Sequence, residues 1–368
     1  MTEKKNDKLW IIVAGLIIGV IAAGLAYFGN PKNMGFCIAC FIRDTAGGLG
    51  LHRAAPVQYI RPEIIGIVLG SFGAALASKQ FSSKGGSAPM TRFILAVSVM
   101  VGCLMFLGCP FRMILRLAGG DLNALVGLVG FVVGIFAGIF FLKNGYSLKR
   151  TYQLTKADGI IMPILVAVVF VLLIAKPAFI FFSEVGAGPG AMHAAVGLSL
   201  VAGLIVGVLA QRTSLCMVGG VRDLVLFKQT RLLLGFVAIL VAALVTNLIL
   251  NGVTPADNVF FKLGMTEQPV AHTDGLWNAL GMLLVGFGSV LLGGCPLRQL
   301  VMSGEGNADS AVTVLGLLVG AAFCHNFGLA SSADGPTPAG KIAVIICLVV
   351  VALIGVLNTF VKSEAKEK

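Results

Sequence analysis

The five residues Gly-Cys-Pro-Phe-Arg at positions 108–112 return as Gly-Cys-Pro-Leu-Arg at positions 294–298. A second motif lies upstream of each copy. It places a cysteine six residues before an Arg-Asp pair, at residues 37–44 and again at residues 216–223. Two separate motifs that recur in the same order show that the chain is an internal duplication.

The composition between the motifs excludes a soluble globular protein. Residues of the AVILMFWYC set make up 57% of the 368 residues, 48 more are glycine, and only 12% are charged. Soluble domains have about 45–50% apolar residues with glycine included, and about 25% charged residues. The net charge of +11 comes from Lys and Arg scattered singly between apolar runs, which is typical of membrane topology signals. We therefore predict an all-α polytopic membrane protein that lies in a lipid bilayer and binds no nucleic acid.

Ten apolar stretches are near the length of about 20 residues that a helix needs to cross a bilayer. The first lacks a small-residue cleavage site, so we expect a retained span and not a signal peptide. Lys and Arg concentrate in the connections on the side of the N-terminus, which predicts that both termini are cytoplasmic. The predicted spans are 9–29, 62–78, 92–109, 122–142, 160–182, 191–211, 232–251, 276–294, 309–329 and 340–361.

The duplication predicts how the chain is organised. We expect a first repeat at 1–150, a linker with one span at 151–190, a second repeat at 191–330, and a terminal span with a cytoplasmic tail at 331–368. Each copy holds four spans, so the single span between them starts the second copy from the opposite side. Inverted repeats are common in transporters, with the substrate site near the midplane. A duplication kept only for helix packing is the alternative, but it does not explain the matched Cys and Arg.

The recurring cysteines are the first candidate site residues. Cys109 and Cys295 each precede a proline, which favours the first position of a helix, so both are expected at the N-termini of short helices. Free backbone amides there favour an anion. The segments around Cys37 and Cys216 are too short to span and are predicted to be half-helices or re-entrant segments. A thiol is a weak, polarisable donor that suits a soft sulfur or selenium acceptor. Packing as small apolar side chains is the alternative for all four.

Four arginines accompany these cysteines, at Arg43, Arg112, Arg222 and Arg298. An arginine at membrane depth must face a cavity or a partner, so all four are candidates for an anion pathway. Arg43 and Arg222 are each followed by an aspartate, and a simple ion pair is an equal alternative for these two. Arg112 and Arg298 have no adjacent acid and are the better candidates.

Cys40 forms a Cys-x-x-Cys pair with Cys37, which is the spacing of a redox pair. Its counterpart in the second copy is Gly219, so a dithiol essential to both halves is excluded and an asymmetric, accessory role stays open. We expect no metal, no cofactor and no catalytic residue. Several other residues are expected to serve packing or to lie at the surface: Cys103, Cys324, Cys347, His52, His193, His272, His325, Gly130, Gly134, Gly316 and Gly320. The loop 252–275 and the tail 362–368 are expected to be solvated.

At these motifs the sequence resembles the YeeE/YedE family of sulfur-transport membrane proteins. The stretch Phe-Cys-Ile-Ala-Cys-Phe-Ile-Arg-Asp at residues 36–44 is most similar to the YedE branch associated with selenium metabolism. The resemblance extends over nearly the whole chain. It implies an hourglass-shaped bacterial inner-membrane protein with cysteines at its central constriction, and uptake of thiosulfate or a related compound. The family's pathway cysteines carry over to Cys37, Cys109, Cys216 and Cys295, and a cytosolic sulfur-carrier protein is a partner to consider.

The leading hypothesis is therefore a permease, not an enzyme, for a small sulfur- or selenium-containing anion. A membrane thiol oxidoreductase that uses Cys37 and Cys40 is the alternative, although the sequence shows no quinone, haem or flavin signature. Transport of a soft metal cation is a third hypothesis. The positive charge near every motif cysteine and the shortage of carboxylates within the spans argue against it.

Overall fold

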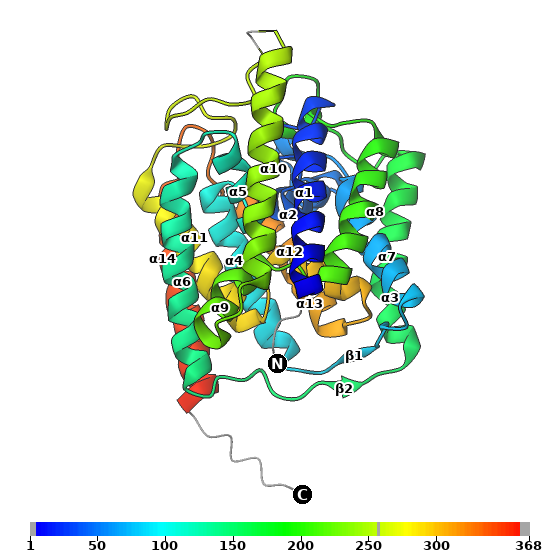
Figure 1. Cartoon of the computed structure of the whole chain (residues 1–368), viewed down its shortest axis with the longest axis vertical. Helices are drawn as coiled ribbons and strands as arrows, with labels where there is room; N and C mark the ends of the chain where they lie inside the picture. Colours follow the sequence, from blue (N-terminus) through cyan, green and yellow to red (C-terminus); the bar gives the residue numbers. More distant parts are fainter. Residues whose placement is uncertain (1–4, 256–257, 361–368) are drawn as a thin grey trace, which may run out of the picture.

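The computed structural model describes residues 5–255 and 258–360, which are mostly helical (Figure 1). Two short strands pair antiparallel near one end of the molecule. The elements in chain order are α1 (Lys5–Tyr27), α2 (Ile38–Gly48), η1 (Ala55–Val57), α3 (Pro62–Ala77), β1 (Lys84–Gly85), α4 (Pro89–Phe106), α5 (Pro110–Ala118), α6 (Asn123–Lys143), β2 (Tyr152–Gln153), α7 (Lys156–Ala175), η2 (Pro189–Ala191), α8 (Val196–Thr213), α9 (Met217–Phe227), α10 (Arg231–Val253), α11 (Gly275–Leu292), α12 (Pro296–Gly304), α13 (Ala308–Asn326) and α14 (Pro338–Phe360).

Ten helical segments of the described chain are long and apolar enough to cross a membrane, as predicted. The chain is an all-α multi-pass membrane protein. The helices α7 and α14 lie at its periphery, since only 22% and 17% of their most apolar windows are buried inside the protein. In Figure 1, α1 begins and α14 ends at the same end of the molecule, which we call the terminal end; the other is the distal end.

The predicted span 160–182 was wrong at both boundaries. The helix α7 begins earlier, because the side chain of Thr155 and that of Asp158 form a capping box at its first turn. It ends at Ala175, because Lys176 adopts a left-handed conformation with φ 46° and the proline at position 177 cannot continue the helix. The predicted span 191–211 likewise begins later, at Val196.

Four short helices follow the four motif cysteines, as the sequence predicts. Cys109 and Cys295 are the residues before α5 and α12, and a proline occupies the first position of each helix. Cys37 and Cys216 are the N-cap residues of α2 and α9. Each cysteine therefore lies at a helix start, where backbone amides have no partner within the helix.

The helices of the two copies pack reciprocally. The helix α1 packs against α10, and its counterpart α8 packs against α3. In the same way α6 packs against α11 while α13 packs against α4, and α5 packs against α10 while α12 packs against α3. Such an exchange of partners is what a two-fold axis between equivalent units produces.

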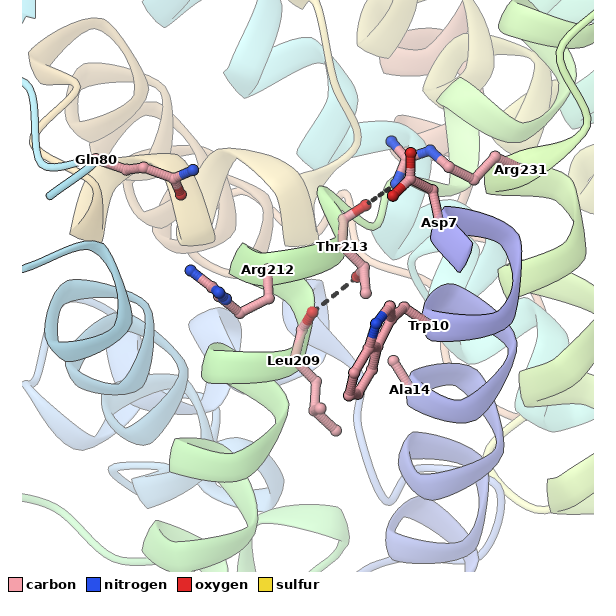
Figure 2. Close-up of a pocket in the computed structure, with 8 residues that line it drawn as sticks. All are labelled: Asp7, Trp10, Ala14, Gln80, Leu209, Arg212, Thr213 and Arg231. Carbon is pink, nitrogen blue, oxygen red and sulfur yellow. Dashed lines mark hydrogen bonds between the residues drawn. The ribbon is translucent and has the colours of Figure 1, made fainter. Parts of the chain in front are cut away.

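Matching helices run in opposite directions where they meet. The start of α1 and the end of α8 together line a cavity of about 370 Å³ at the terminal end (Figure 2). At the distal end, the backbone N–H of Ala194, just before α8, donates to the Asn30 side chain, just after α1. The helices α4 and α11 are also antiparallel, because Arg92 at the start of α4 donates to the carbonyl of Leu292 at the end of α11.

The helices α7 and α14 lie outside this exchange. The first packs against α3 and α12, whereas the second packs against α4 and α11. They therefore cover different sides of the paired copies. The boundaries at 150, 190 and 330 stay a prediction, and the tail 362–368 lies outside the described residues.

Glycines allow the close approach of α6 and α11. A Cβ on Gly130 would lie 2.1 Å from the carbonyl oxygen of Ala279, and one on Gly134 would lie 2.0 Å from that of Leu283. No side chain fits at either position, so the packing role predicted for these glycines is confirmed.

The loop between α10 and α11 is only partly solvated, which corrects the prediction for 252–275. His272 is buried, and its Nε2 lies 2.8 Å from the carbonyl oxygen of Met105 at the end of α4. The Gln268 side chain is also buried and donates to the carbonyls of Lys262 and Gly264. The contact of His272 with Met105 thus holds the end of this loop against α4, and the hydrogen bonds of Gln268 close the loop on itself.

Candidate functional site

Two thiols lie side by side at the start of α2. The Sγ atoms of Cys37 and Cys40 are 2.7 Å apart, and both side chains are fully buried. The backbone N–H of Cys40 donates to the Cys37 Sγ at 3.3 Å, so the first thiol caps the helix that carries the second. The spacing of three residues places both on one side of the first turn.

Cys109 belongs to the same cluster. Its side chain interacts with that of Cys37. The neighbouring rings of Phe36 and Phe111 stack with their centroids 6.0 Å apart, which holds the starts of α2 and α5 together. We call Cys37, Cys40 and Cys109 the distal thiol cluster.

The second copy repeats this arrangement with two thiols. The Sγ atoms of Cys216 and Cys295 are 3.8 Å apart, and the backbone N–H of Gly219 donates to the Cys216 Sγ at 3.4 Å. A Cβ on Gly219 would lie 2.5 Å from the Leu232 side chain, so a cysteine at the position that matches Cys40 would require this side chain to move. We call Cys216 and Cys295 the terminal thiol pair.

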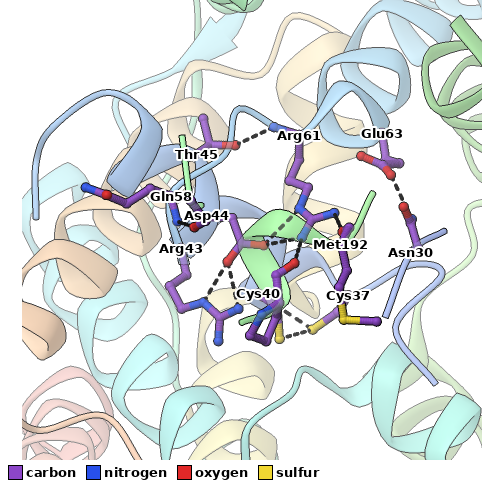
Figure 3. A network of polar contacts seen from close by, with 12 residues as sticks. Asn30, Cys37, Cys40, Arg43, Asp44, Thr45, Gln58, Arg61, Glu63 and Met192 are labelled. Carbon is purple, nitrogen blue, oxygen red and sulfur yellow. Dashed lines mark hydrogen bonds and ion pairs between the residues drawn. The ribbon is translucent and has the colours of Figure 1, made fainter. Parts of the chain in front are cut away.

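Arg43 lies in a buried network of charges (Figure 3). Its Nε and Nη2 donate to one oxygen of Asp44, at 2.9 and 2.7 Å. Arg61 donates to the other oxygen of Asp44 at 2.8 Å, and to the carbonyls of Pro189 and Met192. One carboxylate thus lies between two guanidinium groups, and the network keeps a net positive charge.

A second network lies next to it and joins the two copies. The buried carboxylate of Glu63 accepts hydrogen bonds from the Asn30 Nδ2 at 2.8 Å and from the Ser199 hydroxyl at 3.0 Å. These residues come from the loop after α1, from α3 and from α8. Figure 3 shows Glu63 and Asn30 beside Arg61 and the two thiols.

Arg112 is fully buried and makes no ion pair with a described carboxylate. Its guanidinium donates to the carbonyls of Asn33, Leu107, Pro269 and Val270, and its Nη1 lies 3.9 Å from the Cys40 Sγ. The hydrogen bonds satisfy the cation, but carbonyl dipoles do not cancel its charge. The positive charge therefore remains next to the distal thiol cluster.

The counterpart Arg298 has a carboxylate partner that the sequence prediction missed. Its guanidinium pairs with Glu305 at 2.9 Å, seven residues further along the chain. The residue of the first copy that matches Glu305 is Gly119, and a Cβ there would lie 2.1 Å from the Asn33 side chain. In the first copy the Asn33 side chain thus fills the space that the acid would take. Arg222 pairs with its neighbour Asp223 at 2.8 Å.

Two cavities lie at opposite ends of the molecule. The distal cavity has a volume of about 400 Å³, and its lining includes Arg43 and Leu107. The terminal cavity has a volume of about 550 Å³, and its lining includes Arg222 and Gly293. Arg222 is the counterpart of Arg43, and Gly293 is that of Leu107, so the repeat places equivalent residues on the two walls.

In each cavity, one wall residue lies next to a set of thiols. The Cys40 thiol lies 3.9 Å from the carbonyl oxygen of Leu107 in the distal wall. In the terminal cavity, Gly293 lies two residues before Cys295. All five cysteines are at most 5% exposed, so both sets are covered in this conformation.

The structure also places residues at the distal cavity that the sequence analysis assigned to packing. Cys324 and His325 line it, together with Ser331 and Ser332. The ring of His325 stacks on that of His52 at 4.6 Å between centroids, so these two histidines are not isolated. Neither has a repeated counterpart, since a histidine occurs at neither matching position, and no pattern in the sequence could have marked them.

Two further buried arginines were not among the candidate site residues of the sequence analysis. Arg61 completes the Asp44 network, and Arg116 pairs with Asp121 at 2.6 Å. The sequence did contain a signal for both arginines, because a cation next to an apolar run at membrane depth requires a partner. Within residues 5–255 and 258–360, no group of three or more His, Cys, Asp or Glu side chains is arranged to hold a metal ion.

A known protein family matches the later part of the chain. Residues 212–362 match the protein family described as sulphur transport. The matched range contains α9 to α14, and so Cys216, Arg222, Cys295 and Arg298. A comparison with curated proteins gave no match. The second half of the chain, with both of its motifs, thus matches a family of sulfur-compound transporters.

Proposed function

We propose that the chain as a whole is a member of the sulphur transport family and a permease of the bacterial inner membrane. Its substrate is a small anion that contains sulfur or selenium, such as thiosulfate. The pathway runs along Cys37, Cys109, Cys216 and Cys295, with Cys40 as an accessory thiol. The family match supports the transport of a sulfur compound.

The observation that carries this proposal is the pair of cavities at opposite ends. Each is lined by an equivalent arginine, Arg43 or Arg222, and in each a second lining residue, Leu107 or Gly293, lies close to thiols at the starts of short helices. Two openings of the same construction, one at each end, are what an inverted repeat provides for a path across a membrane. A duplication that served only packing would not need a basic cavity at either end.

The chemistry of the path follows from its lining. At the distal end Arg43 attracts an anion, and the charge of Arg112 favours its approach to the distal thiol cluster. The thiols donate weak hydrogen bonds to a soft sulfur or selenium atom and release it easily. The anion then passes to the terminal thiol pair and leaves past Arg222 and Arg298. Because the thiols are covered, each step requires a local opening of the protein.

The test is uptake into proteoliposomes that contain the purified chain. We expect uptake of labelled thiosulfate above that of empty vesicles, competition by a selenium-containing anion, and no uptake of Cu(I). Uptake of Cu(I) without thiosulfate would favour a cation path and contradict the proposal. Equal rates in loaded and empty vesicles would contradict transport altogether.

A second function is favoured by one observation, the distance of 2.7 Å between the Cys37 and Cys40 thiols. A thiol oxidoreductase would oxidise this pair to a disulfide, passing two electrons and two protons to an acceptor such as diamide. The discriminating variant is Cys40→Gly, which copies Gly219 of the second half. If this variant transports like the parent, the redox pair is not required for transport.

The orientation and the partners belong to the same proposal. The terminal cavity is the more basic of the two, with Arg92, Lys149, Arg150 and Arg222 in its lining. We place this end, and with it both termini, in the cytoplasm, because cationic connections stay on the inner side. A cytosolic sulfur-carrier protein would meet the anion here. To test the orientation, Ser147 is replaced by cysteine. The accessibility of this cysteine to a membrane-impermeant thiol reagent is then measured in whole cells.

A further inference from the structure

A third cavity, of about 370 Å³, lies at the terminal end between the start of α1 and the end of α8 (Figure 2). The pathway proposed above does not use it. It lies where the two copies meet, since α1 and α8 are equivalent helices that pack against each other. Its lining consists of Asp7, Trp10, Ala14, Gln80, Leu209, Arg212, Thr213 and Arg231.

The lining is apolar on one side and cationic on the other. Ala14 and Leu209 lie toward the middle of their helices, whereas Arg212 and Arg231 lie at the helix ends (Figure 2). A ligand that fits has an anionic group at the end of the molecule and an apolar part along the helices.

The surface around the cavity is exposed and apolar. Trp10 is 68% exposed, and Val13 and Ile17 below it on α1 are also exposed. On α8, Ile205 and Val208 continue the same kind of surface. A tryptophan next to exposed aliphatic side chains is typical of the level where headgroups meet acyl chains. The apolar side of the cavity thus continues toward the bilayer.

Arg212 is the cation available to a ligand. It is exposed in the last turn of α8 and makes no hydrogen bond or ion pair with the described residues. Arg231 approaches from the other side and donates to the carbonyl of Thr213 at 2.7 Å, while Asp7 lies next to Arg231 and away from Arg212 (Figure 2). A guanidinium group binds a phosphate through two N–H groups at once.

We propose that this cavity binds the headgroup of one anionic phospholipid. The phosphate lies against Arg212, the Trp10 ring lies at the level of the glycerol, and an acyl chain follows the apolar surface between α1 and α8. Basic pockets between helices on the cytoplasmic side suit anionic headgroups. A free phosphate shares the charge but would gain nothing from Trp10 or from the apolar side. The lipid bridges the two copies and stabilises their contact.

Native mass spectrometry of the purified protein tests this directly. The probes are phosphatidylglycerol and phosphatidylcholine with identical acyl chains, and inorganic phosphate. We expect one phosphatidylglycerol to bind more tightly than phosphatidylcholine. In Arg212→Gln this binding weakens roughly fivefold, as expected for the loss of one cation near a lipid phosphate. The control is Lys156→Gln, an exposed cation in the first turn of α7 at the same end that lines none of the three cavities, and it retains the parent's affinity.

A second variant separates the two sources of phosphate. Trp10→Ala weakens the binding of phosphatidylglycerol and leaves that of inorganic phosphate unchanged. The melting temperature rises with phosphatidylglycerol in the parent and less in Arg212→Gln. The proposal is overturned if Arg212→Gln binds phosphatidylglycerol like the parent, or if phosphatidylcholine binds equally well. It is also overturned if inorganic phosphate displaces the lipid at equal concentration, since the site would then be one for a soluble anion.

Discussion

Arg112 and Val270 are 158 residues apart in the chain, yet the Arg112 Nη2 donates to the Val270 carbonyl oxygen at 3.2 Å. The same guanidinium binds carbonyls of the loop after α1 and of the end of α4. Arg112 thus fastens three separate segments next to the distal thiol cluster. Its charge lies close to the cysteines without a carboxylate to neutralise it.

Replacing Arg112 by lysine should destabilise the protein and slow uptake. An ammonium group donates from one point and cannot reach all of these carbonyls, so buried acceptors lose their partners at about 1–3 kcal/mol each. We expect a lower melting temperature in detergent and a higher apparent KM for thiosulfate. The control is Arg298→Lys, where the partly buried pair with Glu305 keeps its charge. Equal melting temperatures for Arg112→Lys and the parent would contradict the fastening role.

Replacing Cys109 by serine should slow the uptake of thiosulfate by about ten- to a hundredfold, if a loss of ~1–3 kcal/mol falls on the barrier. The oxygen of serine is smaller and less polarisable than sulfur and suits a soft acceptor less well. Cys109→Ala should be at least as slow. The measurement is initial uptake at matched expression.

The control for this series is Cys347→Ser on α14, which lies outside both copies of the motifs and is only partly buried. It should transport like the parent. Parental rates in both Cys109→Ser and Cys295→Ser, together with a defect in Cys347→Ser, would return the motif cysteines to a packing role.

Gly134→Ala should destabilise the contact between α6 and α11. The new methyl group would lie 2.0 Å from the Leu283 carbonyl oxygen, so the helices must separate. Overpacking of this kind costs about 1–3 kcal/mol. In Gly73→Ala the methyl group meets no atom within 4 Å, and alanine favours the helix, so stability should not fall. The melting temperatures of the two variants measure the difference, and equal values would contradict the predicted clash.

Stability should fall with acidification in a manner that depends on His272. Burial lowers the pKa of His272, in the loop before α11, below its ordinary value of 6.5. The unfolded chain therefore takes up a proton at a higher pH than the folded protein does. The stability that His272 contributes is present above pH 6.5 and is lost as the pH falls toward the lowered pKa.

His272→Gln keeps a donor near the Met105 carbonyl oxygen and removes the titrating group. Its melting temperature should therefore fall less than the parent's between neutral and mildly acidic pH. His52→Gln is the comparison, since burial also lowers the pKa of His52. An unchanged pH dependence in His272→Gln would show that this histidine is not buried in the neutral form.

Local signals in the sequence determined the membrane-spanning fold and the starts of the short helices. Runs of apolar residues marked ten spans because a helix must be apolar over its length to cross a bilayer. Pro110 and Pro296 marked helix starts because proline fixes φ and needs no partner for its nitrogen. The glycine spacing of α6 marked a close contact because only glycine leaves room for a neighbouring backbone.

Only the tertiary structure decided which partner each buried charge has. Arg112 and Arg298 occupy the same position of the repeat, yet one binds carbonyls and the other binds Glu305. The difference depends on whether Asn33 fills the space at Gly119, and on a loop more than 150 residues away. The tertiary structure likewise decided that His52 stacks on His325 and that Cys324 lines a cavity. Packing sets the contacts between distant segments. A sequence motif identifies a residue but not the residues that surround it in the folded protein.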